Sequence, residues 1–272
     1  MKLALCQMNV VQGQVESNRL QAKDFICEAA RNGAQVVVLP EMWTCGYDFQ
    51  RLQLHTESEL GPTSNLLAGL ARDLGVYIVG GSFPVRYGAG VANTSMTFDD
   101  QGKTIHTYRK VHLIGLMEED KYLVPGDGLS CFFLNDGLGA AEEGLASTVI
   151  CYDLRFPELA RSAVLQGAKI LFVPAQWPVQ RQSHWETLLR ARAIENQCFV
   201  VGVNVSGHNA NDTFTGGSQV IDPWGDAVAQ AGEKPGILYG EISLNQVDEV
   251  RNRVPSLRDR RPQVYARLNS SQ

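Results

Sequence analysis

Apolar residues along the chain follow two alternating patterns. Apolar runs such as residues 35–39 and 170–173 are typical of strands covered on both faces of a sheet. Between such runs, apolar residues recur at the spacing of one helix face, as in the leucine-rich stripe over residues 66–74 that Gly75 closes. The alternation predicts an α/β fold in which helices cover the faces of sheets.

The strand pattern also predicts two hairpins. Residues 99–102 and 222–225 each lie between two predicted strands and carry the aspartate and glycine typical of turns. The predicted strands cover residues 3–9, 35–39, 76–80, 93–98, 103–108, 145–151, 170–173, 199–204, 217–221, 227–230 and 236–242.

Helix ends are marked by capping residues. Ser17 or Asn18 is placed to cap the first helix, and Gly33 lies just past its end. Pro157 is typical of the first turn of a helix. The predicted helices cover residues 17–32, residues 66–74, the segment from Pro157 to Gly167, and the segment that runs from a Ser183-His-Trp-Glu186 capping box to about Asn196.

The chain contains a weak internal repeat. Residues 32–43 and 166–177 share Gly, Ala, Pro and Trp at a common offset of 134, and the two hairpin turns recur at an offset of 123. Such a repeat suggests two similar α/β layers, and each sheet needs cover on both faces. We therefore expect a four-layer α-β-β-α sandwich with an internal pseudo-two-fold repeat, folded as a single domain over residues 1–272.

Composition narrows the possible functions. Of 272 residues, 44% are apolar and 19% are charged, which is ordinary for a globular chain. A formal net charge of −5 argues against the basic surface of a nucleic-acid-binding protein. Apolar runs reach only about five residues, whereas a membrane span needs about 20, and the first residues lack the apolar core of a signal peptide. We expect a cytoplasmic protein.

The cysteines do not indicate a metal or redox site. No pair has the Cys-x-x-Cys spacing, and neither His-x-His nor His-x-x-x-His occurs, so no metal and no cofactor are expected. A disulfide framework is not expected in a cytosolic chain of this size. Five of the six cysteines are interpreted as packing residues, namely Cys6, Cys27, Cys45, Cys131 and Cys198.

Cys151 is the exception, because it lies where a β-rich run gives way to a predicted helix. Free backbone N–H groups at such a junction can hold an oxyanion. A cysteine nucleophile needs a base, and no histidine is placed at a strand end beside it. Glu41 follows a buried run, and Lys110 ends another predicted strand. Taken singly, these residues are more ordinarily interpreted as a core cysteine, a solvated carboxylate and a basic turn.

Three short blocks resemble the signature of a known family. They are Leu39-Pro-Glu41, Tyr108-Arg-Lys-Val-His-Leu113 and Cys151-Tyr-Asp-Leu-Arg-Phe-Pro-Glu158. In order and separation they resemble the blocks of the nitrilase superfamily of carbon–nitrogen hydrolases, and the resemblance covers essentially the whole chain. It implies a catalytic triad of Glu41, Lys110 and Cys151. A second glutamate, which orients the lysine or the substrate, would be Glu119 by its position before Pro125-Gly126, with Glu118 left open.

The resemblance also implies a mechanism. Glu41 would take the proton of the Cys151 thiol and return it to the departing ammonia, and water would then open the thioester. Lys110 beside the cysteine would favour the thiolate. Together with the N–H of Tyr152, it would hold the tetrahedral oxyanion.

Within the superfamily, the chain is most similar to the omega-amidase group and its bacterial 2-oxoacid amidase relatives. The implied reaction converts 2-oxoglutaramate and water into 2-oxoglutarate and ammonia. Arg155 could bind the substrate carboxylate as a bidentate partner, or it could form a salt bridge with Glu158 or Asp153. Trp177 and His184 are further candidates for the pocket, and for His184 helix capping is an equal explanation.

Two other functions stay open at this point. One is hydrolysis of another C–N bond, in a nitrile, an N-carbamoyl amino acid or an aliphatic amide. The other is a non-catalytic binding protein that has kept the fold. By resemblance we also expect a homodimer, in which the arginine- and proline-bearing tail, about residues 244–272, lies at the subunit interface.

Overall fold

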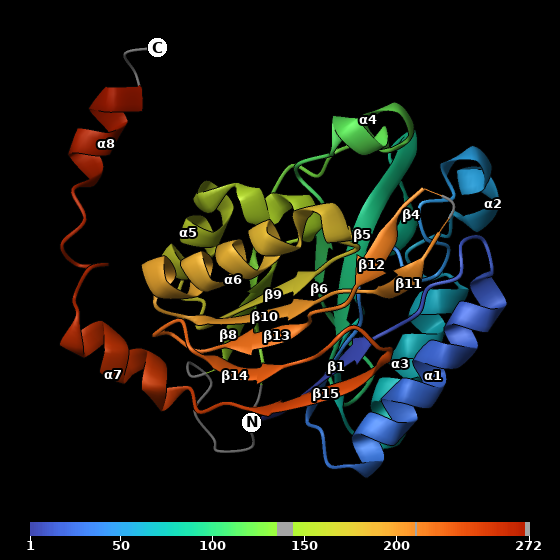
Figure 1. Cartoon of the computed structure of the whole chain (residues 1–272), viewed down its shortest axis with the longest axis horizontal. Helices are drawn as coiled ribbons and strands as arrows, with labels where there is room; N and C mark the ends of the chain where they lie inside the picture. Colours follow the sequence, from blue (N-terminus) through green and yellow to red (C-terminus); the bar gives the residue numbers. More distant parts are fainter. Residues whose placement is uncertain (135–143, 210, 270–272) are drawn as a thin grey trace.

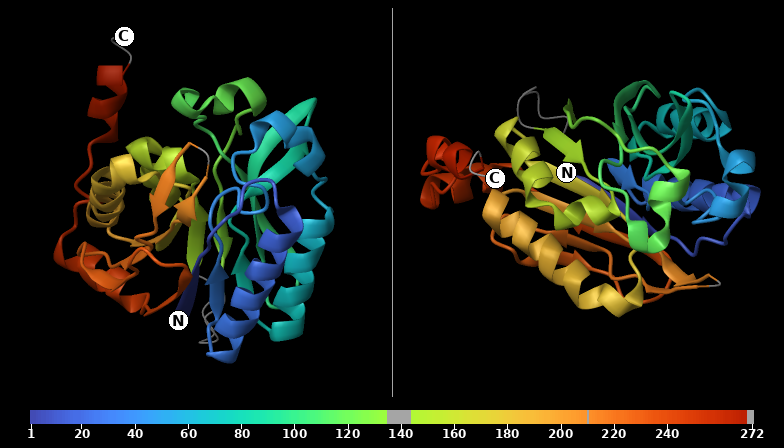
Figure 2. Two further views of the ribbon diagram at one scale, coloured as in Figure 1. Left: turned by 45° about the vertical axis from the view of Figure 1, so that its right-hand side comes forward. Right: turned by 90° about the horizontal axis from the view of Figure 1, so that it is seen from above.

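The computed structural model describes residues 1–134, 144–209 and 211–269. In this part of the chain the strands form a seven-stranded sheet, a six-stranded sheet and a two-stranded ribbon. The two large sheets pack face to face, and helices cover their outer sides (Figures 1 and 2). The predicted α-β-β-α sandwich is confirmed.

The first sheet has the order β15-β1-β2-β3-β5-β4, and β6 also pairs with β5. Strands β1, β2 and β3 are parallel, while β15 returns from the end of the chain to pair antiparallel with β1. The strands are β1 (Lys2–Gln7), β2 (Val36–Val38), β3 (Tyr77–Val79), β4 (Phe83–Tyr87), β5 (Gly90–Phe98), β6 (Thr104–Arg109) and β15 (Gly236–Glu241).

The second sheet has the order β14-β13-β10-β9-β8-β7 and repeats the plan of the first. Three parallel strands, β8, β9 and β10, are flanked by an antiparallel strand on one side and a hairpin on the other. This is the structural form of the repeat in the sequence. The strands are β7 (Cys131–Phe133), β8 (Leu145–Thr148), β9 (Ile170–Pro174), β10 (Phe199–Val203), β13 (Gln219–Ile221) and β14 (Ala227–Gln230).

Two long helices cover each sheet (Figure 1). Helices α1 (Val15–Arg31) and α3 (Pro62–Leu74) pack on the first sheet, and α5 (Pro157–Leu165) and α6 (Gln182–Asn196) pack on the second. The shorter elements are η1 (Phe49–Arg51), α2 (Leu52–His55), η2 (Gly115–Met117), α4 (Glu119–Tyr122), η3 (Cys151–Arg155), η4 (Val179–Arg181) and the ribbon of β11 (Ser206–His208) and β12 (Thr213–Thr215).

Burial on both faces explains why the central strands are apolar throughout. In β2, the side chain of Val37 joins the core under α1 and α3, whereas Val36 and Val38 join the core between the two sheets. All three valines are buried. Since successive side chains of a strand point to opposite faces, a strand with a core on each side needs apolar residues at every position.

The two predicted hairpin turns are confirmed, and they share one set of contacts. Asp99 accepts hydrogen bonds from the N–H groups of Gln101 and Lys103, and Asp222 accepts them from Trp224 and Asp226. The glycine that ends each turn has a positive φ, +78° in the first turn and +91° in the second, which favours glycine over other residues.

Several predicted element ends are wrong, because tertiary contacts decide them. Helix α1 begins at Val15, since the amide of Asn18 bonds to the backbone of Val11 and Thr44 instead of capping the helix. Helix α6 begins at Gln182 with no side-chain cap, so the predicted capping box at residues 183–186 is absent. Strand β8 ends at Thr148, three residues before the predicted end.

The tail that follows β15 contains two further helices. Helix α7 (Asn245–Arg253) is anchored to the body, because its Val247 and Val250 side chains are buried. Helix α8 (Pro262–Asn269) lies at the outer side of the molecule (Figure 1), and its Tyr265 side chain is 43% exposed. Among the described residues, no helix has the length and apolar character of a membrane span.

Candidate active site

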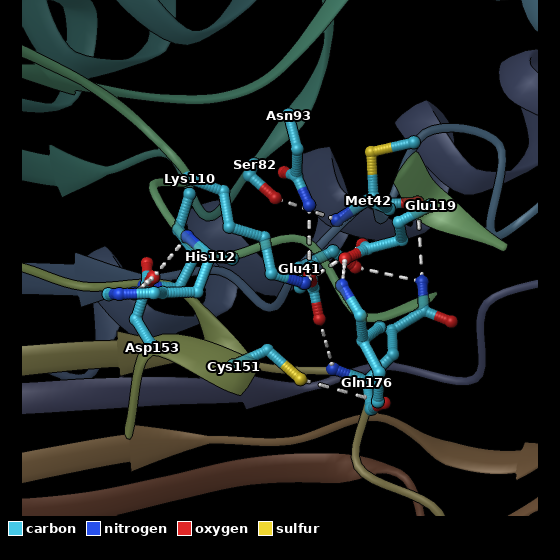
Figure 3. A network of polar contacts seen from close by, with 12 residues as sticks. Glu41, Met42, Ser82, Asn93, Lys110, His112, Glu119, Cys151, Asp153 and Gln176 are labelled. Carbon is cyan, nitrogen blue, oxygen red and sulfur yellow. Dashed lines mark hydrogen bonds and ion pairs between the residues drawn. The ribbon is translucent and has the colours of Figure 1, made fainter. Parts of the chain in front are cut away.

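Segments that follow strands of both sheets meet at one site (Figure 3). Glu41 lies beyond β2 and Lys110 directly follows β6, both in the first sheet; Cys151 and Gln176 lie beyond β8 and β9 of the second. Glu119 is the first residue of α4. Glu41, Cys151 and Gln176 thus lie beyond the carboxyl ends of parallel strands, where α/β folds commonly place reactive side chains, whereas Lys110 follows an antiparallel strand.

A lysine between two carboxylates forms the centre of the site. The Nζ of Lys110 lies 2.8 Å from Oε1 of Glu41 and 2.8 Å from Oε1 of Glu119, and all three side chains are fully buried. Burial opposes the charge of Lys110, but Glu119 and Glu41 outweigh it and raise its pKa well above the usual value. Burial also raises the pKa of Glu119, which Lys110 only partly offsets.

The two candidates for the second glutamate point in opposite directions. Glu119 bonds to Lys110 through Oε1 and accepts the N–H of Ile114 at 2.9 Å through Oε2. Glu118 is turned outward and pairs with Lys121. Of the two, the structure therefore brings Glu119 to the lysine.

Glu41 is held by more than the lysine. Among the described residues, four donors reach its carboxylate, which accepts the hydroxyl of Tyr47 at 2.8 Å, the amide of Asn93 at 2.8 Å, Lys110, and the backbone N–H of Gln176 at 2.9 Å. Burial, with the charge of Glu41 next, raises the pKa of Tyr47, so its hydroxyl stays a donor. Together these donors fix the position of the carboxylate.

Sequence reasoning missed Tyr47, Asn93 and Gln176. Gln176 lies in the repeat segment directly before Trp177, and Asn93 lies at the start of a predicted strand, but neither position carries a signal of its role. Asn93 lies 52 residues from Glu41 in the sequence, and Gln176 lies 135 residues from it. Both contacts therefore exist only in the folded chain.

Cys151 occupies a strained backbone position. It has a φ of +46° and begins the η3 turn, three residues after the end of β8, and its sulfur lies 3.9 Å from the carbonyl oxygen of Gln176. A positive φ is uncommon outside glycine and often occurs at functional sites. No hydrogen bond among the described residues occupies the N–H of Tyr152, which is thus open to an oxyanion.

Opposing effects act on the pKa of the Cys151 thiol. Burial, with the charge of Glu41 next, raises the pKa of Cys151 well above its usual value, and Lys110 opposes this effect without overcoming it. Lys110 thus lowers the pKa of the thiol, as expected, but burial and Glu41 keep the net shift upward. The reason is that a thiolate would be one more negative charge beside two buried carboxylates and a single lysine.

A small pocket opens beside the sulfur. Arg155 lies over the ring of Trp177, with its guanidinium carbon 4.7 Å from the ring centroid, and it is 3.4 Å from Nδ1 of His184. Neither Asp153 nor Glu158 pairs with Arg155 among the described residues. The pocket is lined by Ile114, Met117, Cys151, Tyr152, Arg155, Gln176, Trp177, Pro178 and Arg181.

A larger cavity of about 440 Å³ adjoins the pocket through two shared residues, Met117 and Arg181. Its wall includes Tyr47, which bonds to Glu41, and Phe49, whose ring stacks between those of Tyr47 and Tyr122. Tyr47 thus connects the wall of this cavity to the buried cluster. Within the described residues, no group of His, Cys, Asp and Glu side chains is arranged to hold a metal ion.

Comparison with known proteins gives a consistent result. The carbon-nitrogen hydrolase family matches residues 2–252. The chain is 40% identical to the 2-oxoglutaramate amidase of Bacillus subtilis over 263 residues, which cover 97% of this chain and 98% of that protein. It is 32% identical to the human omega-amidase NIT2 over 278 residues, which cover 97% and 96% of the two chains.

Solved structures agree with this comparison. The crystal structure of a carbon-nitrogen hydrolase from Helicobacter pylori G27 superposes with a TM-score of 0.90 at 26% identity, covering 98% of this chain and 97% of that one. The structure of yeast Nit3, a member of branch 10 of the nitrilase superfamily, gives a TM-score of 0.85 at 29% identity over 94% of each chain.

Replacing the thiol or the carboxylate should stop turnover while the fold is kept. We expect Cys151→Ala to have no measurable activity and Glu41→Gln to lose about 10²- to 10⁴-fold in kcat, the usual contribution of a general base. Ammonia release by purified, folded variants is the measurement. Cys198→Ala is the matched control, because Cys198 is equally buried in the core of the same sheet. Substantial activity in folded Cys151→Ala would exclude a cysteine nucleophile.

Removal of the lysine should destabilise the protein. Lys110→Ala leaves two carboxylates buried without their partner, and we expect a loss of about 3–5 kcal/mol in the free energy of unfolding. Lys169→Ala, at the partly exposed pair with Asp248, should cost no more than about 1 kcal/mol. Chemical denaturation of both variants gives the comparison.

The destabilisation should also depend on pH. In Lys110→Ala, burial and mutual repulsion should raise the folded-state pKa of the Glu41–Glu119 pair above its value in the unfolded chain. The variant is therefore most stable at low pH, and it loses stability as pH rises through that pKa. The deficit relative to wild type should therefore shrink between pH 7 and pH 5. A deficit independent of pH would show that its cause is lost packing.

Proposed function

Because the chain belongs to the carbon-nitrogen hydrolase family, whose members hydrolyse non-peptide C–N bonds, we propose that it is an omega-amidase. Its substrate would be a short amide with a carboxylate at the far end, with 2-oxoglutaramate as the leading candidate. The observation that carries the proposal is Arg155, whose guanidinium lines the same pocket as the Cys151 sulfur and has no carboxylate partner among the described residues.

Arg155 is suited to fix the length of the substrate. A guanidinium binds a carboxylate through two parallel hydrogen bonds, and stacking on Trp177 with the contact to His184 holds it in place. The reacting carbonyl carbon must lie within about 3–3.5 Å of the Cys151 sulfur. A substrate that satisfies both groups must therefore have a particular separation between its carboxylate and its amide.

In the proposed first half-reaction, the Cys151 sulfur attacks the amide carbon while its proton passes to Glu41. The negative charge moves to the carbonyl oxygen, which receives hydrogen bonds from Lys110 and the N–H of Tyr152. Glu41 then gives the proton to the amide nitrogen. The C–N bond breaks, ammonia leaves, and a thioester remains.

The second half-reaction uses the same groups. Glu41 takes a proton from water, and the hydroxide attacks the thioester carbon to form a second oxyanion in the same place. The C–S bond then breaks as the proton returns to the sulfur, and the carboxylic acid product leaves. Glu119 does not exchange protons in this scheme, and its role is to hold Lys110.

The amide specificity can be tested by substitution of Arg155. Loss of a charge-assisted hydrogen bond costs about 1.5–3 kcal/mol, so Arg155→Met should lower kcat/KM on 2-oxoglutaramate by about 10- to 150-fold. Activity on neutral butyramide should change little. Arg190→Met, at an exposed position of α6, is the control and should leave both rates unchanged. Equal losses on acidic and neutral amides would assign Arg155 to the fold instead.

A substrate panel tests the wider assignment. Wild-type ammonia release should be faster from 2-oxoglutaramate and 2-oxosuccinamate than from nitriles, N-carbamoyl amino acids or aliphatic amides. A preference for nitriles or N-carbamoyl amino acids would place the chain in another branch of the superfamily. Absence of turnover on every compound, with no labelling of Cys151 by a thiol-reactive substrate analogue, would favour a non-catalytic binding protein.

We also propose that the protein is a homodimer in which the tail contributes to the interface. Apolar side chains remain exposed on the second sheet's helices and on the tail, including Leu165, Ile194, Val254 and Tyr265. They belong to α5, α6, the segment after α7, and α8, and the helices α5, α6, α7 and α8 lie on the same side of the molecule in Figure 1. A second subunit would cover them.

Light scattering should give twice the chain mass of 29.9 kDa at micromolar concentration. Deletion of the residues from Pro262 onward should weaken the dimer, because α8 supplies the exposed Tyr265. A mass of one chain for the intact protein would refute the dimer. A truncated protein that dimerises as tightly as the full chain would place the interface elsewhere.

A further inference from the structure

A buried aspartate joins the lysine segment to the nucleophile turn. Asp153, two residues after Cys151, is 1% exposed. Its Oδ1 accepts the backbone N–H of His112 and the ring Nδ1 of His112, each at 2.9 Å (Figure 3). Its Oδ2 accepts the hydroxyl of Tyr108 at 2.7 Å and the N–H of Ile150 at 3.0 Å.

These contacts lie on both sides of two reactive residues. Tyr108 and His112 flank Lys110 at a distance of two residues each, and Ile150 directly precedes Cys151. One carboxylate therefore ties the end of β6, in the first sheet, to the turn after β8, in the second. The segments that carry the lysine and the sulfur are thereby joined through a single side chain.

The turn needs such support because it is strained. The φ of +46° at Cys151 persists only if the surrounding structure holds it. The bond from Ile150 to Asp153 closes the turn at its start. Arg192, buried in α6, supports the other end, where its Nε and Nη2 donate to the carbonyl oxygen of Leu154 at 3.1 and 2.8 Å.

The ring of His112 belongs to the same group of contacts around Asp153. It stacks on Phe156 with 3.5 Å between ring centroids and 7° between ring planes. Its Nδ1 lies 2.9 Å from Oδ1 of Asp153. Asp153 and the residues that bond to it do not line the pocket, whereas Arg155 does.

We propose that Asp153 is a positioning residue that fixes the Cys151 sulfur relative to Lys110 and Glu41, and that its hydrogen bonds determine the rate of thioester formation and not the affinity for substrate. This inference rests on the proposed roles of those three residues. It does not depend on which amide is the substrate.

The test is Asp153→Asn, which keeps the shape of the side chain but presents an NH₂ group to donors. Misplacement of reacting groups by about 1 Å can lower the rate about 10²-fold, and we expect a fall of that size in kcat. KM should change less than about twofold, as it does when the lost interaction acts only in the transition state. For each variant, kcat is divided by the amount of Cys151 thiol, which is titrated with iodoacetamide in the folded protein. The rate of that alkylation at pH 7 should fall together with kcat.

Asp222→Asn is the matched control. Asp222 is also buried and also accepts backbone N–H groups in a turn, but it lies in the β13–β14 hairpin, outside the described pocket. We expect it to lower the melting temperature without changing kcat per titrated thiol. Wild-type kcat and alkylation rate in Asp153→Asn, or equal losses of kcat in both variants, would overturn the inference.

If Asp153→Asn does not fold, Tyr108→Phe provides a second test, because it removes one of the donors to Asp153 and leaves the carboxylate in place. We expect kcat to fall about tenfold at constant KM. This corresponds to the loss of one hydrogen bond, since a tenfold change in rate is about 1.4 kcal/mol. An unchanged kcat would contradict the proposal. Turnover retained by Cys151→Ala would instead overturn the proposed function, so the two failures can be told apart.

Discussion

The burial of Lys110 between two carboxylates is the interaction on which the rest of the site depends. Each ion removed from water costs several kcal/mol, and only close opposite charges with complete hydrogen bonding offset that cost. One lysine faces both Glu41 and Glu119. The donors Tyr47 and Asn93 add hydrogen bonds that hold the Glu41 carboxylate in the core.

The sandwich supplies these groups because it brings the ends of two sheets together. Lys110 and Glu41 come from the first sheet, whereas Cys151 and Gln176 come from the second. The core between the sheets is apolar and closely packed, and close packing leaves little freedom for one sheet to shift against the other. Contacts that cross between the halves, such as the bond from Gln176 to Glu41, can therefore have fixed lengths.

The sequence predicts well those features that are local. Apolar runs locate the strands, turn residues locate both hairpins, and the three blocks that carry Glu41, Lys110 and Cys151 indicate the family. It predicts poorly what depends on contacts distant in sequence. Nothing near Asn93 or Asp153 indicates a bond across 52 or 45 residues, and the raised pKa of the thiol follows from burial and from a carboxylate in the other half of the chain.

The neutral thiol has a consequence for the chemistry. The site holds two carboxyl side chains, Glu41 and Glu119, beside one lysine. When sulfur attacks and its proton passes to Glu41, the carboxylate becomes neutral as the substrate oxygen becomes negative, so the total charge of the buried site does not change. A preformed thiolate would add a further negative charge at high cost. Transfer of the proton during attack avoids that cost and moves the charge next to Lys110, which explains why a nucleophile with a raised pKa suits this site.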